Sequence, residues 1–179
     1  MNILIACELS GKVREAFRAK GHNAISCDIL PSDDDSPYHY TGDVFELLAE
    51  RRPSKRWQDT HADDHRGASS FDLMIAFPPC THLCSSGARW WSSKVQAQSD
   101  ALDFVQRLMD ADIGKIALEN PVGKIGSAIR PADQYIQPWQ HGHGDTKKTG
   151  LWLKGLPKLT PTNIVSGRSN RIHAMPDTK

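Results

Sequence analysis

Residues 72–81 read Asp72-Leu73-Met74-Ile75-Ala76-Phe77-Pro78-Pro79-Cys80-Thr81, an apolar run followed at once by two prolines and a cysteine. The run from Leu73 to Phe77 predicts a short buried strand, typical of the centre of a parallel sheet. Because proline has a fixed φ and no backbone N–H, the strand is expected to stop at Pro78. Cys80 then follows the carboxyl end of a strand, which is where open α/β sheets bind ligands. Cys80 is therefore a candidate nucleophile, and an inert packed thiol is the alternative.

The composition describes a globular protein of one domain. The chain has 179 residues, 39% of them hydrophobic, and a mean hydropathy of -0.50, which allows a sizeable core. Its apolar runs are much shorter than the roughly 20 residues that cross a bilayer, and its start has no basic lead-in or cleavage site. We therefore expect a cytoplasmic protein without a membrane partner. The net charge of +1 neither indicates nor excludes a nucleic-acid partner.

The four cysteines predict neither a disulfide nor a metal site. Cys7 and Cys27 end predicted core strands, where a free cysteine behaves as a small apolar side chain, and disulfides are not expected in the cytoplasm. Cys80 and Cys84 have His82 between them, which is compatible with a metal site. Their C-x3-C spacing without a second cysteine pair argues against zinc.

The N-terminal segment predicts a β-α-β unit. Apolar runs at Ile3–Ala6 and Ala24–Cys27 predict two strands. Between them, Lys12–Lys20 has apolar residues at helical spacing, and Gly21 closes that helix. The second strand ends in Asp28. In nucleotide-binding folds an acid at this place accepts hydrogen bonds from ribose hydroxyls; a solvated loop acid is the alternative.

The middle of the chain predicts loops around one short helix. Residues 31–41 are polar and contain several aspartates, and a short helix follows Gly42-Asp43-Val44 and ends near Ala49. Residues 51–70 are charged and aperiodic, which predicts a mobile surface insertion. The insertion contains side chains that are also compatible with a metal site: His61, Asp63, Asp64 and His65.

The second half predicts one long helix between two buried strands. Apolar residues recur on one face over Lys94–Ala111, with Ser93 as the N-cap. The apolar run Ile116–Leu118 leads directly into Glu119-Asn120-Pro121. A right-handed crossover makes this strand a parallel neighbour of the strand before Cys80. Cys80 and Glu119 are therefore expected at the same edge of the sheet.

The remaining segments have weaker patterns. Residues 122–135 are irregular, and Leu151–Leu153 predicts a late strand. From about residue 157 the sequence predicts an irregular tail.

In this order the motifs resemble those of the DNA (cytosine-5) methyltransferases, and most closely the short members encoded by phages and prophages. The family's Pro-Cys motif matches Phe77-Pro78-Pro79-Cys80-Thr81, and its Glu-Asn-Val motif matches Glu119-Asn120-Pro121. The resemblance covers residues 2–120. It implies one α/β domain over residues 1–179, with a Rossmann-like methyltransferase sheet flanked by helices and no separate target-recognition domain. It also implies the cytoplasm of a bacterium or of a phage-infected host cell.

The resemblance further implies S-adenosylmethionine-dependent methylation of cytosine C5 in DNA. The C5 carbon is a weak nucleophile, and addition of a thiolate to C6 turns the ring into an enamine that reacts at C5. The family's pattern gives Cys80 this covalent role, gives Glu119 the contact with ring N3, and gives Asn120 the orientation of that carboxylate. In duplex DNA the target cytosine must first be flipped out of the stack.

The cofactor is expected along the same edge of the sheet. The loop Cys7-Glu8-Leu9-Ser10-Gly11 takes the place of the family's cofactor loop, with Glu8 at the methionine amino group. Asp28 matches the acid on the cofactor ribose, and Asp43 matches the acid on the adenine amino group. The cofactor-binding residues that the resemblance implies are Cys7, Glu8, Leu9, Ser10, Gly11, Asp28, Ile29, Asp43, Val44, Phe77 and Pro78.

The predicted contacts with DNA depend on fewer residues. Trp90 and Trp91 either stack on a base or pack as a lid on the core. The family's late Gln-x-Arg-x-Arg motif has no clean match, and Gln140, Lys147 and Lys148 near its place are candidates for the cytosine O2 or for phosphates. The predicted nucleic-acid contacts are Thr81, Arg89, Trp90, Lys147 and Lys148.

Departures from the family leave two alternatives open. The chain has no room for a recognition domain and no closing C-terminal helix. It is then either a cofactor- or DNA-binding regulatory protein without activity, or an enzyme that uses the same chemistry on a nucleotide, RNA or a modified cytosine. Assembly as a homo-oligomer is one way to compensate for the small size.

Overall fold

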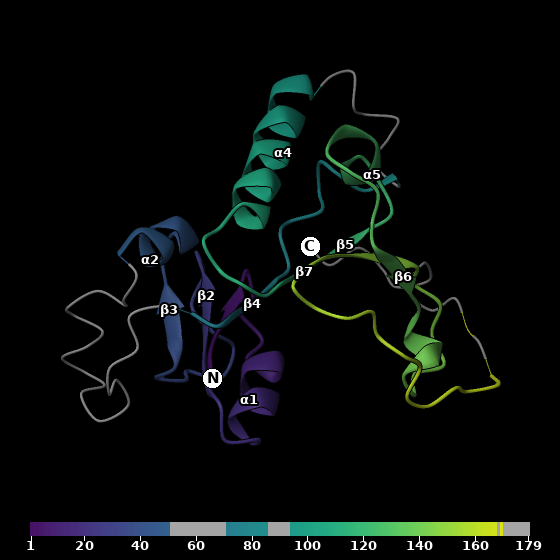
Figure 1. The fold of residues 1–179 in the computed structure, drawn as a ribbon, viewed down its shortest axis with the longest axis horizontal. Helices are drawn as coiled ribbons and strands as arrows, with labels where there is room; N and C mark the ends of the chain where they lie inside the picture. Colours follow the sequence, from purple (N-terminus) through teal and green to yellow (C-terminus); the bar gives the residue numbers. More distant parts are fainter. Residues whose placement is uncertain (51–70, 86–93, 168, 170–179) are drawn as a thin grey trace.

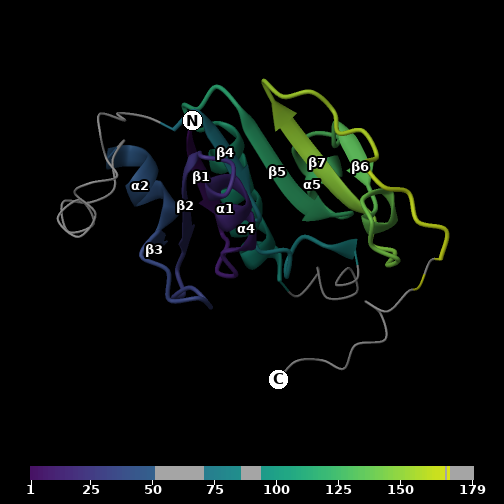
Figure 2. The same cartoon turned by 90° about the horizontal axis from the view of Figure 1, so that it is seen from below.

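The computed structural model describes residues 1–50, 71–85, 94–167 and 169. They form a mixed sheet of seven strands in the order β3-β2-β1-β4-β5-β7-β6, flanked by helices (Figures 1 and 2). The fold is therefore α/β and compatible with a Rossmann-like arrangement. The elements are β1 (Asn2–Ala6), α1 (Lys12–Arg18), β2 (Asn23–Asp28), β3 (His39–Thr41), α2 (Val44–Glu50), β4 (Leu73–Ala76), α4 (Val95–Met109), β5 (Ile116–Pro121), α5 (Ile125–Ala128), β6 (Gln134–Ile136), the 3-10 turn η2 (Pro138–Gln140) and β7 (Thr149–Lys154).

The first five strands are parallel. The chain moves outward from β1 to β2 and β3, then returns to place β4 and β5 on the other side of β1. This reversal puts a topological switch point between the carboxyl ends of β1 and β4 (Figure 2), which is where such sheets bind ligands. Ala76 lies opposite Leu118 in parallel register. The prediction that the strands before Cys80 and Glu119 are neighbours is therefore confirmed.

The other end of the sheet is antiparallel. β7 pairs with β5 in the opposite direction, and β6 pairs with β7 in the same antiparallel manner. Thr149, the first residue of β7, lies opposite Pro121, the last residue of β5. The start of β7 therefore lies at the same edge of the sheet as the end of β5.

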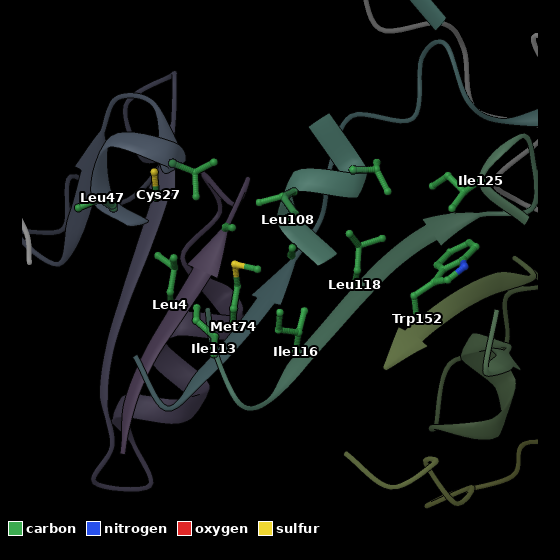
Figure 3. Packing of buried hydrophobic residues seen from close by; sticks show 14 of the residues in the cluster. Leu4, Cys27, Leu47, Met74, Leu108, Ile113, Ile116, Leu118, Ile125 and Trp152 are labelled. Carbon is green, nitrogen blue, oxygen red and sulfur yellow. The ribbon is translucent and has the colours of Figure 1, made fainter. Parts of the chain in front are cut away.

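The two faces of the sheet are covered by different helices. Leu4 of β1 and Leu118 of β5 belong to the core cluster that includes Leu108 of α4 (Figure 3). Ile5, the next residue of β1, points to the other face and packs with Phe17 of α1. Figure 1 shows α4 and α1 on opposite sides of the sheet. Burial on both faces explains why the central strands are continuous apolar runs.

Several short elements differ from the sequence prediction. The segment 31–41, predicted as a loop, ends in β3, and the segment 122–135, predicted as irregular, contains α5 and β6. Elements of three or four residues are too short to show a period in the sequence. The N-cap of α4 is Lys94, and the predicted cap Ser93 lies outside the described residues, as does the insertion 51–70.

The predicted irregular tail is held against the sheet. Gln134 of β6 exchanges two hydrogen bonds of 2.7 Å with the backbone of Leu159. Through residue 167 this segment has neither helix nor strand. In the part of the chain that the structure describes, no helix is long and apolar enough to cross a membrane.

A buried arginine joins α1 to the rest of the N-terminal half. Arg14 is fully buried, and its guanidinium donates to the Ser26 hydroxyl on β2 at 2.7 Å and to the carboxylate of Asp34 in the loop after β2. The Ser26 hydroxyl is also 2.9 Å from Nδ1 of His39. A buried charge must be compensated in this way. The network therefore joins α1 to β2 and to the loop after β2.

We expect Arg14→Met to lower the Tm by about 5 °C, because the change keeps most of the side-chain volume but removes its donors from Ser26 and Asp34. Differential scanning calorimetry measures the shift. Lys12→Met, at an exposed position of the same helix, is the matched control and should leave the Tm unchanged. Equal Tm values for the two variants would contradict a stabilising role for the network.

Candidate functional site at the carboxyl edge of the sheet

A pocket of about 280 Å³ lies at the switch point. Its lining residues come from the loop after β1, the start of α1 and the end of β4: Cys7, Glu8, Leu9, Ser10, Val13 and Phe77. All of these except Val13 were predicted from the sequence as cofactor-binding. Two larger hollows beside α4 are lined by other residues.

The loop after β1 is a tight turn whose conformation is set by its own polar groups. Cys7 has a φ of 59°, which turns the chain sharply at the end of the strand. Glu8 is buried, and its carboxylate accepts hydrogen bonds from the Ser10 hydroxyl at 3.1 Å and from the Val13 N–H at 2.8 Å. Glu8 therefore stabilises the N-terminus of α1. The predicted contact of Glu8 with an amino group would compete with these bonds.

Two acids lie beside the same turn. Burial raises the pKa of the Cys7 thiol to about 12, and the negative charges of Asp28 and Asp43 add to the rise. Asp28 accepts a hydrogen bond from the Leu30 N–H at 3.0 Å, and Asp43 accepts one from the Phe45 N–H at 2.8 Å. In both residues the acceptor is the Oδ1 oxygen of the carboxylate. The structure thus brings Cys7, Asp28 and Asp43 together at one edge of the sheet.

The apolar residues predicted at the cofactor fall into two groups. Ile29 exposes 77% of its surface directly after β2, and Phe77 lines the pocket. Val44 and Pro78 are buried, and Val44 packs within the core cluster. Their side chains belong to the protein interior, so that a ligand can meet these two residues only through their backbone.

The loop that carries Cys80 is held by the neighbouring strand. Asn120 is buried, and its Nδ2 donates to the Pro78 carbonyl at 2.8 Å. Its Oδ1 has no hydrogen-bond partner within the described residues. Asn120 therefore orients the Cys80 loop, which differs from its predicted role of orienting the Glu119 carboxylate.

The segment after β5 makes a second contact with the same loop. Cys84 and Gly123 form an antiparallel bridge, and the two backbones around it are joined by hydrogen bonds of 3.0 and 2.7 Å. A Cβ at Gly123 would lie 2.8 Å from the Cα of Cys84 and still closer to the Leu83 carbonyl. The close approach therefore requires glycine. A glycine three residues after Asn120 is the signal in the sequence that could have revealed this contact.

Glu119 is partly buried near the end of β5. Its Oε1 accepts a hydrogen bond from the hydroxyl of Thr149, the first residue of β7. Thr149 was not among the residues that the sequence singled out. The carboxyl group is therefore held from β7 and not from Asn120.

The Cys80 thiol is partly buried, and two of its neighbours have opposite effects on its pKa. Burial raises the pKa of Cys80, Cys84 adds to the rise, and the positive charge of Lys147 lowers it. Lys147, predicted as a DNA contact, therefore lies within electrostatic reach of Cys80. Because the net shift is upward, Cys80 is mostly a protonated thiol at neutral pH.

The other predicted DNA contacts have different surroundings. Thr81 and Lys148 are exposed, and the Lys148 ammonium lies 4.5 Å from the centre of the Tyr135 ring. Arg89 and Trp90 lie outside the described residues, as do the histidines and aspartates of the insertion. Within the residues that are described, no group of three or more His, Cys, Asp or Glu side chains is arranged to hold a metal ion.

One edge of the sheet thus combines a thiol, a carboxyl group, two further acids and a pocket. A thiol can act as a nucleophile, and a nearby carboxyl group can donate or accept a proton. No protein-family model matches the chain, and no curated protein matches it.

We expect Gly123→Ala to force the Cys80 loop away from β5 and to lower the free energy of unfolding by about 1–3 kcal/mol, the usual range for overpacking. Urea denaturation measures the loss. Gly114→Ala is the matched control, because a Cβ at Gly114 would meet no atom within 4 Å. A Gly123→Ala protein as stable as the control would show that the loops do not need this approach.

We expect Lys147→Met to raise the pKa of the Cys80 thiol, because the lysine charge stabilises the thiolate. The measurement is the pH dependence of alkylation by iodoacetamide in a Cys84→Ser background. Cys7, with a pKa of about 12, and Cys27, which is buried, should react slowly. The alkylation midpoint should move to higher pH in Lys147→Met but not in Lys148→Met. Identical midpoints in the two lysine variants would contradict the assignment.

Proposed function

We propose that this chain is an S-adenosylmethionine-dependent methyltransferase that acts on C5 of cytosine in DNA, with Cys80 as the nucleophile. The observation that carries the proposal is that Cys80 follows β4 and Glu119 lies near the end of β5, the neighbouring parallel strand, so that both are at one edge of the sheet. The resemblance of the Pro-Cys and Glu-Asn motifs to those of cytosine-5 methyltransferases supports the same assignment.

The residues at the pocket are chemically suited to the cofactor, which would supply an electrophilic methyl group. Asp28 is the last residue of β2, a place where an acid accepts hydrogen bonds from ribose hydroxyls. Asp43 would accept a hydrogen bond from the adenine amino group, while Ile29 and Phe77 offer apolar surface to the ring. Glu8 fits less well, because its carboxylate already binds the start of α1.

The two groups at the edge would divide the activation of cytosine between them. Cys80 loses its proton to solvent, and its sulfur forms a bond to C6, which makes C5 nucleophilic. Glu119 binds ring N3 and withdraws electron density from the ring during this addition. C5 would take its methyl group from the bound cofactor, which leaves as a neutral thioether. Solvent then takes the C5 proton, the C5–C6 double bond re-forms, and the S–C6 bond breaks to release Cys80. Lys147 favours the first step because its charge stabilises the thiolate.

The DNA would approach this edge with the target base flipped out. Thr81, Lys147 and Lys148 are exposed there, and the lysines can bind phosphate oxygens. Contacts with phosphates position DNA without reading its sequence.

We expect Cys80→Ser to abolish methylation and to leave S-adenosylmethionine binding close to that of the wild type, because the serine hydroxyl is a far weaker nucleophile toward C6. Mass spectrometry of nucleosides from DNA treated with each protein measures 5-methylcytosine and would also reveal any other modified base. Isothermal titration calorimetry measures cofactor binding.

DNA with 5-fluorocytosine tests the covalent step directly. The fluorine prevents loss of a proton from C5, so that the Cys80–C6 bond persists and a protein–DNA complex should be isolated. Cys84→Ser, which removes a thiol four positions away, should still form this complex, and Cys80→Ser should not. Methylation by Cys80→Ser at the wild-type rate would refute the mechanism, and cofactor and DNA binding by the wild type without any transfer would favour a regulatory role.

A further inference from the structure

The hydroxyl of Thr149 forms a hydrogen bond with the Glu119 carboxylate. Thr149 exposes 8% of its surface, and its Oγ1 donates to Oε1 of Glu119. A buried hydroxyl is normally hydrogen-bonded, and here its partner is the carboxyl group that the proposed reaction uses.

The register of β7 brings the two side chains together. Glu119 lies opposite Leu151, and Pro121 lies opposite Thr149. Thr149 and Glu119 are therefore diagonal neighbours on the same face of an antiparallel pair, a spacing at which side chains interact.

The residues after Thr149 keep β7 in this register. A Cβ at Gly150 would lie 2.9 Å from the Trp152 ring and 3.2 Å from Ala132, so the strand is closely packed at this point. Trp152 is buried, and its Nε1 donates to the Arg130 carbonyl at 2.9 Å. Because threonine is also stiff at χ1, its hydroxyl is held in one direction.

A hydroxyl has a single hydrogen to donate, and Thr149 donates it to Oε1. A proton on the Glu119 carboxyl group then resides on Oε2, the oxygen that stays available to the base. We propose that Thr149 is a positioning residue that holds Glu119 with Oε2 directed to ring N3. The inference rests on the proposed function and deepens it, because it names the group that prepares the carboxyl for the base.

The test compares Thr149→Val, which keeps the branched shape and removes the hydroxyl, with Thr149→Ser, which keeps the hydroxyl. For Thr149→Val we expect kcat for DNA methylation to fall roughly 10- to 100-fold, with the KM values for DNA and S-adenosylmethionine close to the wild type. An effect on kcat alone indicates an interaction made in the transition state. Thr149→Ser should stay within roughly threefold of the wild-type kcat, since its hydroxyl can make the same bond.

A second measurement does not depend on activity. The carboxyl ¹³C signal of Glu119 can be recorded in the full chain labelled at glutamate, without DNA. The sequence has five glutamates, and the signal lost in Glu119→Gln identifies Glu119. We expect this signal to shift in Thr149→Val and to stay near its wild-type position in Thr149→Ser.

The outcomes separate the inference from the function on which it rests. A wild-type kcat in Thr149→Val, an unmoved Glu119 signal, or a Thr149→Ser protein as slow as Thr149→Val would each overturn the role of Thr149. A wild-type protein that methylates no cytosine would overturn the proposed function instead, and the Glu119 signal would still decide whether Thr149 holds the carboxyl group.

Discussion

The hydrogen bond from the Asn120 side chain to the Pro78 carbonyl is the contact on which the candidate site depends. Pro78 and Pro79 have no backbone N–H, so the ladder of β4 cannot continue toward Cys80. Beyond the end of β4, the side-chain amide of Asn120 holds the chain by donating to the Pro78 carbonyl at 2.8 Å. Asn120 is 1% exposed, and a hydrogen bond in such surroundings is little weakened by water. Because Asn120 follows Glu119 directly, the same bond fixes the thiol loop relative to the carboxyl group.

The central sheet could be predicted from the sequence because its strands are buried on both faces. Continuous apolar runs such as Leu73–Ala76 therefore stand out, and the right-handed crossover placed Cys80 and Glu119 at one edge. β3 and β6 have three residues each and leave no such run. The sequence also could not predict which groups the polar side chains of the site bind. Glu8 was assigned to a ligand but caps α1, because the turn at Cys7 returns its carboxylate to the helix.

Electrostatics separates two thiols that look alike in the sequence. Both Cys7 and Cys80 follow the end of a central strand, and burial raises the pKa of each. The neighbours of Cys7 are Asp28 and Asp43, whose charges raise its pKa further, whereas Cys80 has Lys147, whose charge lowers it. Cys7 is therefore suited to line a pocket without reacting. Cys80 is a thiol at rest, and the Lys147 charge is the neighbour that favours the reactive thiolate.

The reversed direction of β7 explains why one short segment reaches both reactive groups. In a parallel strand the residues at this edge would be those at the end of β7, Leu153 and Lys154, instead of Thr149 at its start. The antiparallel pairing places Thr149 at Glu119, while Lys147, two residues earlier, acts on Cys80 through its charge. A hydroxyl and a cation from the same three residues thus act separately on the carboxyl group and the thiol. Strand direction is not encoded in an apolar run, so the sequence alone showed two lysines near the site but not the threonine beside them.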